Sequence, residues 1–294
     1  MKRTVSLILV LLLLLCGCTK NHREENNKIK VVTTIYPLYD FVRAVGGDRV
    51  DITLLISAGT EVHSFEPTPS DMKAIYNADL FFYIGGESDT WAERILADTE
   101  TKAYPLMNSV NLLFEDGEDE YDEHIWTSSD NAVLMIEKIA SVLCKTDSLN
   151  SQEYKNNCNK YCENIKSVSN QIMKTVKNSK NKFILVADRF PFKYMASQYG
   201  IEYESALDGC ASSTDVSIKV MKRLVDTVKS KGVKYVFCTE LSNRNIAKSL
   251  SEQTGVKILE LHSAHNVTAD DFKDGITYVD IMKRNLSTFK KGLE

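Results

Sequence analysis

The chain has 294 residues, of which 43% are hydrophobic and 26% are charged, and it contains only 13 glycines and 5 prolines. These values exclude collagen, low-complexity disorder and a disulfide-dense mini-protein, and the length predicts about two domains. The 36 basic and 40 acidic residues give a net charge of −4. The chain therefore lacks the basic excess of a nucleic-acid-binding protein.

The N-terminus has the features of an export signal. Two basic residues precede an apolar run over residues 5–15, which is too short for a transmembrane helix and is typical of a signal peptide. The run is followed by Gly17-Cys18, which resembles a bacterial lipobox, where the cysteine is lipidated. We expect a signal peptide over 1–17, a lipidated Cys18 and a polar tether over 18–29. The alternative is an ordinary cleaved signal.

Short apolar runs, many of them β-branched or aromatic, alternate with helical patterns, which predicts βαβ units with strands buried on both faces. The predicted strands are 30–36, 50–56, 79–85, 102–106, 182–188, 201–206, 233–238 and 256–261. The predicted helices are 38–45, 71–77 with Ser70 as N-cap, 129–143, 151–177, 215–229 and 243–252. The predicted fold class is α/β, with parallel-sheet lobes over 30–128 and 180–294 joined by a long, rigid helical section over 129–179.

Cysteine usage indicates free thiols rather than a disulfide framework. Apart from Cys16 and Cys18 there are five cysteines: Cys144, Cys158, Cys162, Cys210 and Cys238. An odd number cannot all pair within one chain, and no C-x-x-C motif is present. We therefore expect buried free thiols and no cysteine zinc site.

The histidines carry the strongest functional signal. Four of the five follow predicted strands or lie in irregular segments that enter helices: His63, His124, His262 and His265. Ligand sites of open α/β sheets lie at the carboxyl ends of strands, so these positions are candidates. His63 lies in a loop that Pro67 and Pro69 stiffen. His124 follows an acidic run over 115–120, which either forms a solvated loop or attracts cations.

Two of these segments resemble metal-ligand motifs of the zinc/manganese class of solute-binding proteins of ABC importers. The first is Glu61-x-His63-x-Phe65-Glu66-Pro67-Thr68-Pro69-x-Asp71, and the second is Asp122-x-His124-x-Trp126 followed by Asp130-Asn131-Ala132. The resemblance extends over essentially the whole mature chain. It implies two α/β lobes joined by a long helix, with a divalent ion in the cleft between them. It also implies that His63 and His124 bind the ion from the first lobe.

The second lobe departs from the family pattern after its first strand. Zinc-binding members usually carry a third histidine there, where this chain has Ala187 and Asp188. Asp188 either binds the metal through oxygen or pairs with Arg189 or a more distant base.

A second departure follows the last strand, where family members often place an aspartate ligand. This chain has His262 and His265 instead. The position at the strand end favours His262, while His265 either binds the metal or orients a ligand. Glu240 is either an alternative ligand of the metal or, as the preferred interpretation, a hydrogen-bond acceptor that orients a ligand. The predicted ligand set is His63, His124, Asp188 and His262.

Three imidazoles and one carboxylate favour zinc, with manganese as the second choice. The resemblance implies a lipid-anchored protein on the extracytoplasmic face of the cell membrane, delivering the ion to an ABC permease and its cytoplasmic ATPase. We expect a monomer that binds no nucleic acid and is not an enzyme. Binding of a chelated metal is an alternative. A zinc hydrolase is a less favoured one, because the chain lacks H-E-x-x-H and related motifs.

Overall fold

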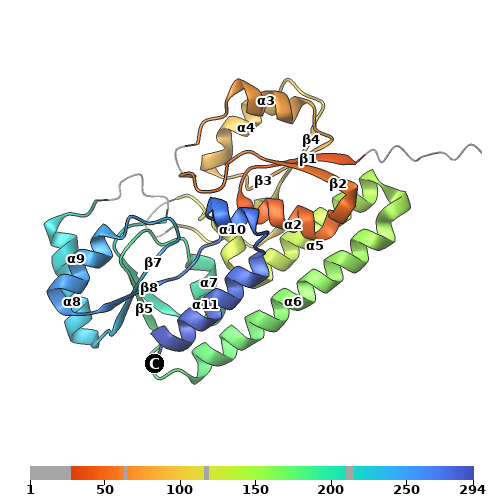
Figure 1. The fold of residues 1–294 in the computed structure, drawn as a ribbon. Coiled ribbons are helices and arrows are strands. Elements are labelled where there is room, and N and C mark those ends of the chain that lie inside the picture. The colour runs from red at the N-terminus through yellow and green to blue at the C-terminus, as the bar shows by residue number, and fades with distance from the viewer. Residues whose placement is uncertain (1–27, 63–64, 116–118, 210–214) are drawn as a thin grey trace, which may run out of the picture.

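The structure is a computed structural model that describes residues 28–62, 65–115, 119–209 and 215–294. Within these residues two four-stranded parallel sheets lie beside each other, with one long helix beneath both (Figure 1). The first sheet has the order β2-β1-β3-β4, formed by β1 (Ile29–Thr33), β2 (Val50–Leu54), β3 (Leu80–Tyr83) and β4 (Lys102–Pro105). The second has the order β6-β5-β7-β8, formed by β5 (Phe183–Val186), β6 (Glu202–Ser205), β7 (Tyr235–Cys238) and β8 (Lys257–Glu260). The predicted α/β fold is confirmed.

Helices cover both faces of the first sheet. Because neighbouring strand residues point to opposite faces, Phe82 packs toward α2 (Tyr36–Gly46) and α5 (Ser129–Thr146), while Phe81 packs toward the other side. There it meets α3 (Pro69–Tyr76) and α4 (Thr90–Leu96). Burial on both faces is what the continuous apolar run of β3 predicts.

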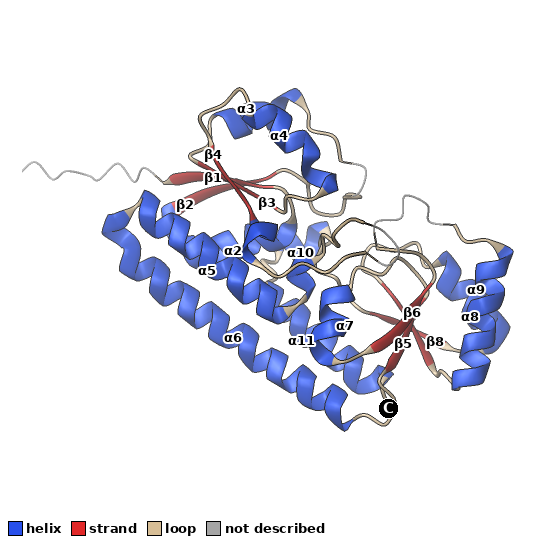
Figure 2. Cartoon of the chain, turned by 180° about the vertical axis from the view of Figure 1, so that it is seen from behind, coloured by secondary structure: helices blue, strands red, loops and turns tan. Residues whose placement is uncertain are grey.

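The second sheet repeats this arrangement. Phe183 and Leu185 pack against α8 (Ile218–Lys231) and α9 (Asn245–Thr254). Ile184 and Val186 face α7 (Lys193–Tyr199) and α11 (Tyr278–Gly292), and α10 (Ala269–Lys273) lies between the lobes in the view of Figure 2. Short 3₁₀ helices complete the described elements: η1 (Gly47–Arg49), η2 (Glu87–Asp89), η3 (Leu106–Ser109), η4 (Ile125–Thr127) and η5 (Ser148–Asn150).

The long helix α6 (Ser151–Asn178) has 28 residues, close to the predicted 151–177. At 1.5 Å per residue it is about 42 Å long. Its buried stripe, which includes Ile165 and Ile172, belongs to the same apolar cluster as Val31 of the first sheet and Ile184 of the second. One continuous core therefore runs beneath both lobes and opposes large independent movement of either one.

Some element boundaries differ from the sequence prediction. Helix α3 begins two residues early, because the Thr68 side chain accepts a hydrogen bond from the Asp71 amide and Asp71 returns one, a capping box that replaces the predicted Ser70 cap. Pro69 occupies the first helical turn, where its missing N–H costs nothing. Helices α4, α7, α10 and α11 were not among the predicted elements.

A buried carboxylate connects three helices on the side away from the sheets. Asp40 of α2 is 1% exposed and accepts hydrogen bonds from Arg43 (2.6 Å), from the Tyr278 amide at the start of α11 (2.8 Å) and from the Tyr161 hydroxyl of α6. We expect Asp40→Ala to lower the free energy of unfolding by about 2–4 kcal/mol, because buried donors lose their acceptor. Urea denaturation measures this change.

The matched control for Asp40 is Glu153→Ala, which removes an exposed ion pair with Arg49. Such pairs contribute less than about 1 kcal/mol. Equal destabilisation by the two substitutions would contradict the role given to Asp40.

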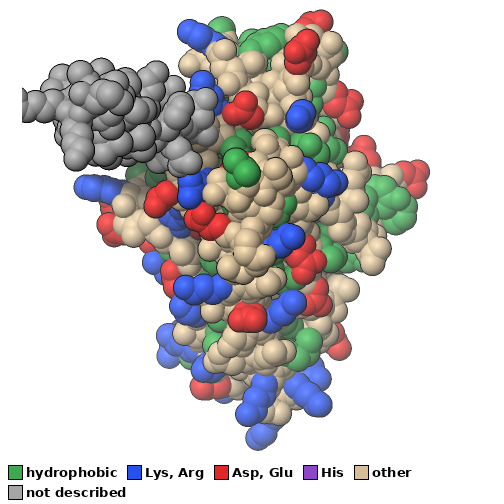
Figure 3. Space-filling model, turned by 90° about the vertical axis from the view of Figure 1, so that its right-hand side faces the viewer, with side chains coloured by type: hydrophobic (Ala, Val, Ile, Leu, Met, Phe, Trp, Pro, Cys, Tyr) green, Lys and Arg blue, Asp and Glu red, His purple; other side chains and the backbone are tan. Residues whose placement is uncertain are grey.

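Basic and acidic side chains are interspersed on the face shown in Figure 3, and no described histidine is visible there. Among the described cysteines, Cys144, Cys158, Cys162 and Cys238 are free thiols, while Cys210 lies outside the described residues. No described helix combines the length and apolar character needed to cross a membrane.

Candidate metal site

His124 is held rigidly just before η4. Its ring is 1% exposed, and its Nδ1 lies 3.1 Å from Oδ1 of Asp122, which also accepts the His124 amide at 2.7 Å. The Tyr194 hydroxyl donates to the Asp122 carbonyl (2.8 Å), fixing this turn against α7. Since a carboxylate only accepts, Nδ1 carries the proton and Nε2 carries the lone pair, which is the tautomer in which a carboxylate-bonded histidine binds metal.

The carboxylates around His124 raise the pKa of its imidazole ring. Burial alone would lower the pKa of His124, but Asp122, Glu123 and Glu115 together more than offset this effect and raise the pKa above its ordinary value. Donor atoms of Glu115, Asp122 and His124 lie within 4.8 Å of one another, the single such group of three found among the described residues. This surrounding negative charge favours a cation at the imidazole.

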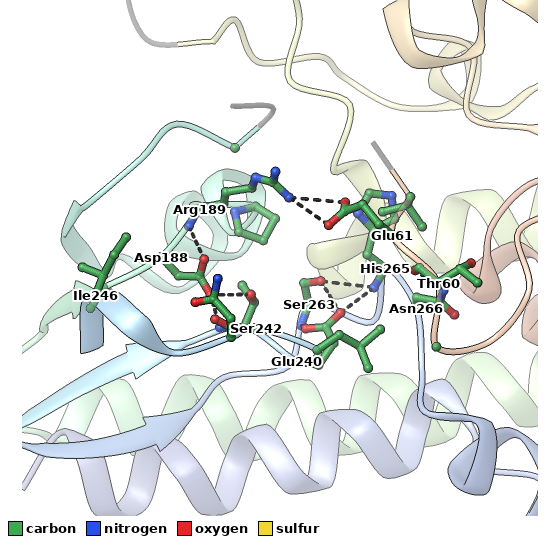
Figure 4. Close-up of a pocket in the computed structure, with 18 of the residues that line it drawn as sticks. Thr60, Glu61, Asp188, Arg189, Glu240, Ser242, Ile246, Ser263, His265 and Asn266 are labelled. Carbon is green, nitrogen blue, oxygen red and sulfur yellow. Dashed lines mark hydrogen bonds and ion pairs between the residues drawn. The ribbon is translucent and has the colours of Figure 1, made fainter. Parts of the chain in front are cut away.

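His265 lies in a turn after β8 that Glu240 anchors. The Glu240 carboxylate accepts hydrogen bonds from the Ser263 hydroxyl (2.6 Å), the Ser263 amide (2.7 Å) and the His265 amide (3.1 Å). Three donors from one turn fix the direction in which His265 leaves the backbone. Glu240 follows β7, so the ends of two neighbouring strands cooperate to position this ring (Figure 4).

The same turn separates His262 from His265. Ala264 has φ +61°, a left-handed conformation that is unusual for a residue with a side chain. His262 is 4% exposed, lines a small cavity with Tyr278 and Asn285, and accepts the Ala264 amide at Nδ1 (2.9 Å). A neutral imidazole that accepts at Nδ1 is protonated at Nε2, so it offers no lone pair to a metal.

The His265 turn is bonded to the first lobe as well. Nδ2 of the Asn266 side chain donates to the carbonyls of Ser57 (3.0 Å) and Thr60 (2.9 Å), and the Gly59 backbone amide donates to the Val267 carbonyl (2.8 Å). The Trp126 indole donates to the Ser263 carbonyl (2.8 Å). The turn therefore belongs structurally to the boundary between the lobes.

These constraints bring His124 and His265 together. Their ring centroids are 5.4 Å apart with the planes at 89°, and Trp126 packs 4.7 Å from His265. Two imidazoles on one tetrahedral zinc ion, with Zn–N near 2.0–2.1 Å, would have centroids about 5 Å apart. The observed separation is within a few tenths of an ångström of that spacing, which is compatible with one ion between the two rings.

Asp188 lies in the cleft, but its oxygens are engaged within the second lobe. Oδ1 accepts the Arg189 amide (2.9 Å), and Oδ2 accepts the Thr239 hydroxyl (2.8 Å) and amide (3.2 Å). These bonds hold together the ends of β5 and β7. The geometry favours a positioning role for Asp188 over the predicted role of direct ligand.

Arg189 reaches across the cleft. Its Nη1 lies 3.3 Å and 3.4 Å from the two carboxylate oxygens of Glu61 in the first lobe. The Arg189 side chain is 14% exposed, whereas that of Glu61 is 51% exposed. A guanidinium thus stands in the candidate metal cleft, where its side chain contacts Glu61 across the cleft rather than only pairing with Asp188 as the sequence suggested.

Among the sequence-predicted residues, the structure brings His124 and His265 together, with Asp188 and Glu240 nearby. It places His262 in a separate cavity. His63 and Cys18 lie outside the described residues. Asp122 was not predicted as the hydrogen-bond partner of His124, although its place two residues before the histidine was a usable signal.

Two parallel-sheet lobes on a helical backbone, with imidazoles meeting between them, define the class of metal-receptor solute-binding proteins. The sequence profile of one family, described as zinc-uptake complex component A, periplasmic (ZnuA), matches residues 31–292. The chain belongs to this family.

Known relatives agree with this assignment. The zinc-binding lipoprotein AdcA of Streptococcus pneumoniae is 28% identical over 307 residues, covering 98% of this chain but only 61% of AdcA. The chain therefore spans less than two thirds of that relative. The high-affinity zinc uptake system protein ZnuA of Bacillus subtilis is 27% identical over 303 residues, covering 96% of this chain and 94% of ZnuA.

A solved structure matches both lobes. The Zn(II)-bound ZnuA-like domain of Streptococcus pneumoniae AdcA superposes with a TM-score of 0.80 and 28% identity. The match covers 91% of this chain and 99% of that domain. The whole two-lobed architecture is therefore shared.

Proposed function

We propose that this protein captures a divalent transition-metal ion, zinc in the first place, between its lobes and delivers it to an ABC permease driven by a cytoplasmic ATPase. The observation that carries the proposal is the 5.4 Å spacing of His124 and His265 at the lobe boundary. The zinc-binding names of the relatives, AdcA and ZnuA, support the choice of ion.

We propose His124 and His265 as two of the ligands and His63 as the third. Nitrogen donors favour zinc over manganese, because manganese prefers oxygen ligands. The carboxylate oxygens of Asp188 and Glu240 already accept hydrogen bonds within the protein. In this proposal Asp188, Glu240 and His262 position the ligands without touching the ion.

We further propose the cellular arrangement that the sequence predicts. Residues 1–17 act as a signal peptide, Cys18 is lipidated, and residues 18–29 tether a monomeric receptor to the extracytoplasmic face of the membrane. The lobes span 30–128 and 180–294, joined by the helical section 129–179. The periplasmic description of the family and the lipoprotein name of AdcA support this placement.

Metal content tests the proposed function. The purified chain is offered equal zinc, manganese and iron, desalted and analysed by elemental mass spectrometry, beside His124→Ala. We expect about one zinc per chain in the wild type and none in the variant, since catalytic and structural zinc sites need three or four protein ligands. Preferential retention of manganese, or of no metal, would contradict the proposal.

The proposed site should release zinc in acid. The pKa of His124 lies above its ordinary value, so this imidazole becomes protonated at a higher pH than a free histidine near 6.5. Only the neutral imidazole binds metal, and zinc affinity should fall more than about tenfold between about pH 7.5 and 5.5. Competition with a chromophoric chelator, corrected for its own protonation, measures this; an unchanged affinity would rule out imidazole ligation.

A further inference from the structure

The cleft between the lobes is larger than a metal ion needs. It contains a cavity of about 320 Å³, lined from the first lobe by residues 59–62 and from the second lobe by segments that follow β5, β7 and β8. Pockets that bind small organic molecules begin at about 300 Å³. The space beside His265 is therefore sufficient for a small molecule as well as an ion.

The cavity lining contains one group suited to an organic anion, Arg189, beside the carboxylates of Glu61, Asp188 and Glu240, which accept hydrogen bonds or ion pairs within the protein. Arg189 contributes a permanent positive charge in a planar fork that matches a carboxylate. Ser242, Asn243 and Asn245 contribute hydroxyl and amide groups, which a bare ion held by imidazoles does not use. Helix α9 begins at Asn245, so the partial positive charge of its first turn adds to that of Arg189.

The wall that carries these groups has an unusual backbone. Leu241 (φ +57°) and Arg244 (φ +60°) both adopt the left-handed conformation that residues with side chains rarely take. Such conformations cluster at ligand-binding segments, where the surrounding structure holds them in place. In this turn the Ser242 hydroxyl accepts the Arg244 backbone amide (3.1 Å), and the Asn243 side-chain oxygen accepts the Asn245 backbone amide (2.9 Å).

The charges in the cleft also require an explanation. A divalent ion at His265 would share the cavity with the guanidinium of Arg189, and the carboxylates of Glu61, Asp188 and Glu240 in the same lining offset only part of the repulsion between the two cations. The carboxylate of Glu61 already rests on Nη1 of Arg189, which shows that a carboxylate fits at that position. Glu61 is half-exposed and its two contacts with Nη1 of Arg189 are long, so an incoming anion can compete with it for this nitrogen.

We infer that the cleft binds the metal ion together with a small carboxylate chelator. Arg189 holds the carboxylate of the chelator, and the chelator's donor atoms complete the coordination of an ion that His124 and His265 hold. The chemical class is an α-amino acid or a hydroxycarboxylate. This inference rests on the proposed function, because it requires an ion at the two imidazoles.

Native mass spectrometry of the purified chain with zinc tests the inference, using L-histidine and citrate as probes in separate arms and acetate as a monodentate control. We expect a complex of one chain, one zinc and one chelator with L-histidine or citrate, and zinc alone with acetate. The arm that gives the complex identifies the source of the carboxylate. Zinc without chelator in every arm would overturn the inference, whereas no bound zinc in any arm would instead overturn the proposed function.

Three variants locate the carboxylate contact. Arg189→Gln should keep zinc but weaken chelator binding at least about tenfold, the effect of losing a charge-assisted hydrogen bond. Arg223→Gln is the matched control, because Arg223 pairs with Glu204 away from the cavity; it should change neither ligand. Glu61→Gln should strengthen chelator binding several-fold by removing the competing carboxylate, and it decides the question if Arg189→Gln does not fold. Unchanged or weaker chelator binding by Glu61→Gln would contradict the inference.

Discussion

His265→Ala is expected to lower zinc affinity by more than about 100-fold, because outer groups that only orient a ligand are already worth 10–100-fold and a direct ligand contributes more. The physical basis is the pairing of its ring with that of His124 at 5.4 Å. Isothermal titration, with a competing chelator to reach high affinities, measures the change. The folded state is checked by thermal melting without metal.

His262 provides the matched comparison for His265. Its Nδ1 accepts the Ala264 amide and so supports the turn that presents His265. Asparagine places an oxygen acceptor near the position of Nδ1, so His262→Asn should retain zinc affinity within a few-fold, while His262→Ala should lose more by loosening the turn. If His262→Asn lost zinc as completely as His265→Ala, His262 would be a ligand and the present assignment would be wrong.

Asp122→Asn is expected to weaken zinc binding by about 10–100-fold, the usual cost of removing the carboxylate behind a metal-bound histidine. Asparagine can still accept the His124 amide, so the fold is retained, but the negative charge that supports Nδ1–H is lost. Because Asp122 raises the pKa of His124, the variant should also lose zinc at a lower pH than the wild type.

Zinc titrations at several pH values separate these two effects of Asp122→Asn. The control is Asp130→Asn, which removes an exposed carboxylate in the first turn of α5 and should leave both the affinity and its pH dependence unchanged. A variant Asp122→Asn with wild-type affinity would mean that His124 does not bind the ion.

The fold could be predicted largely because its signals are local. Continuous apolar strands such as that of Phe81 and Phe82 indicate burial on both faces, and the apolar stripe of α6 fixes its length to within one residue. The start of α3 was misplaced because Ser70 and Thr68 are both good caps. Thr68 is the N-cap because Asp71 lies three residues after it, the spacing at which the two residues exchange the hydrogen bonds of a capping box.

The site could be predicted only in part, because its geometry depends on backbone conformation and on contacts between distant segments. The sequence places His262 and His265 together after one strand. The left-handed conformation of Ala264 separates the two rings, and an alanine gives no sequence signal for that conformation. The contact of Arg189 with Glu61 joins positions 128 residues apart and exists only because the two lobes pack as they do.

X-ray absorption at the zinc edge of the loaded, purified chain tests most directly whether histidines of both lobes hold the ion. We predict at least two imidazoles, with nitrogen at about 2.0–2.1 Å from zinc, and the loss of one imidazole in His124→Ala when zinc is supplied at high concentration. A sulfur neighbour at about 2.3 Å, or a shell of oxygen atoms alone, would contradict the central claim.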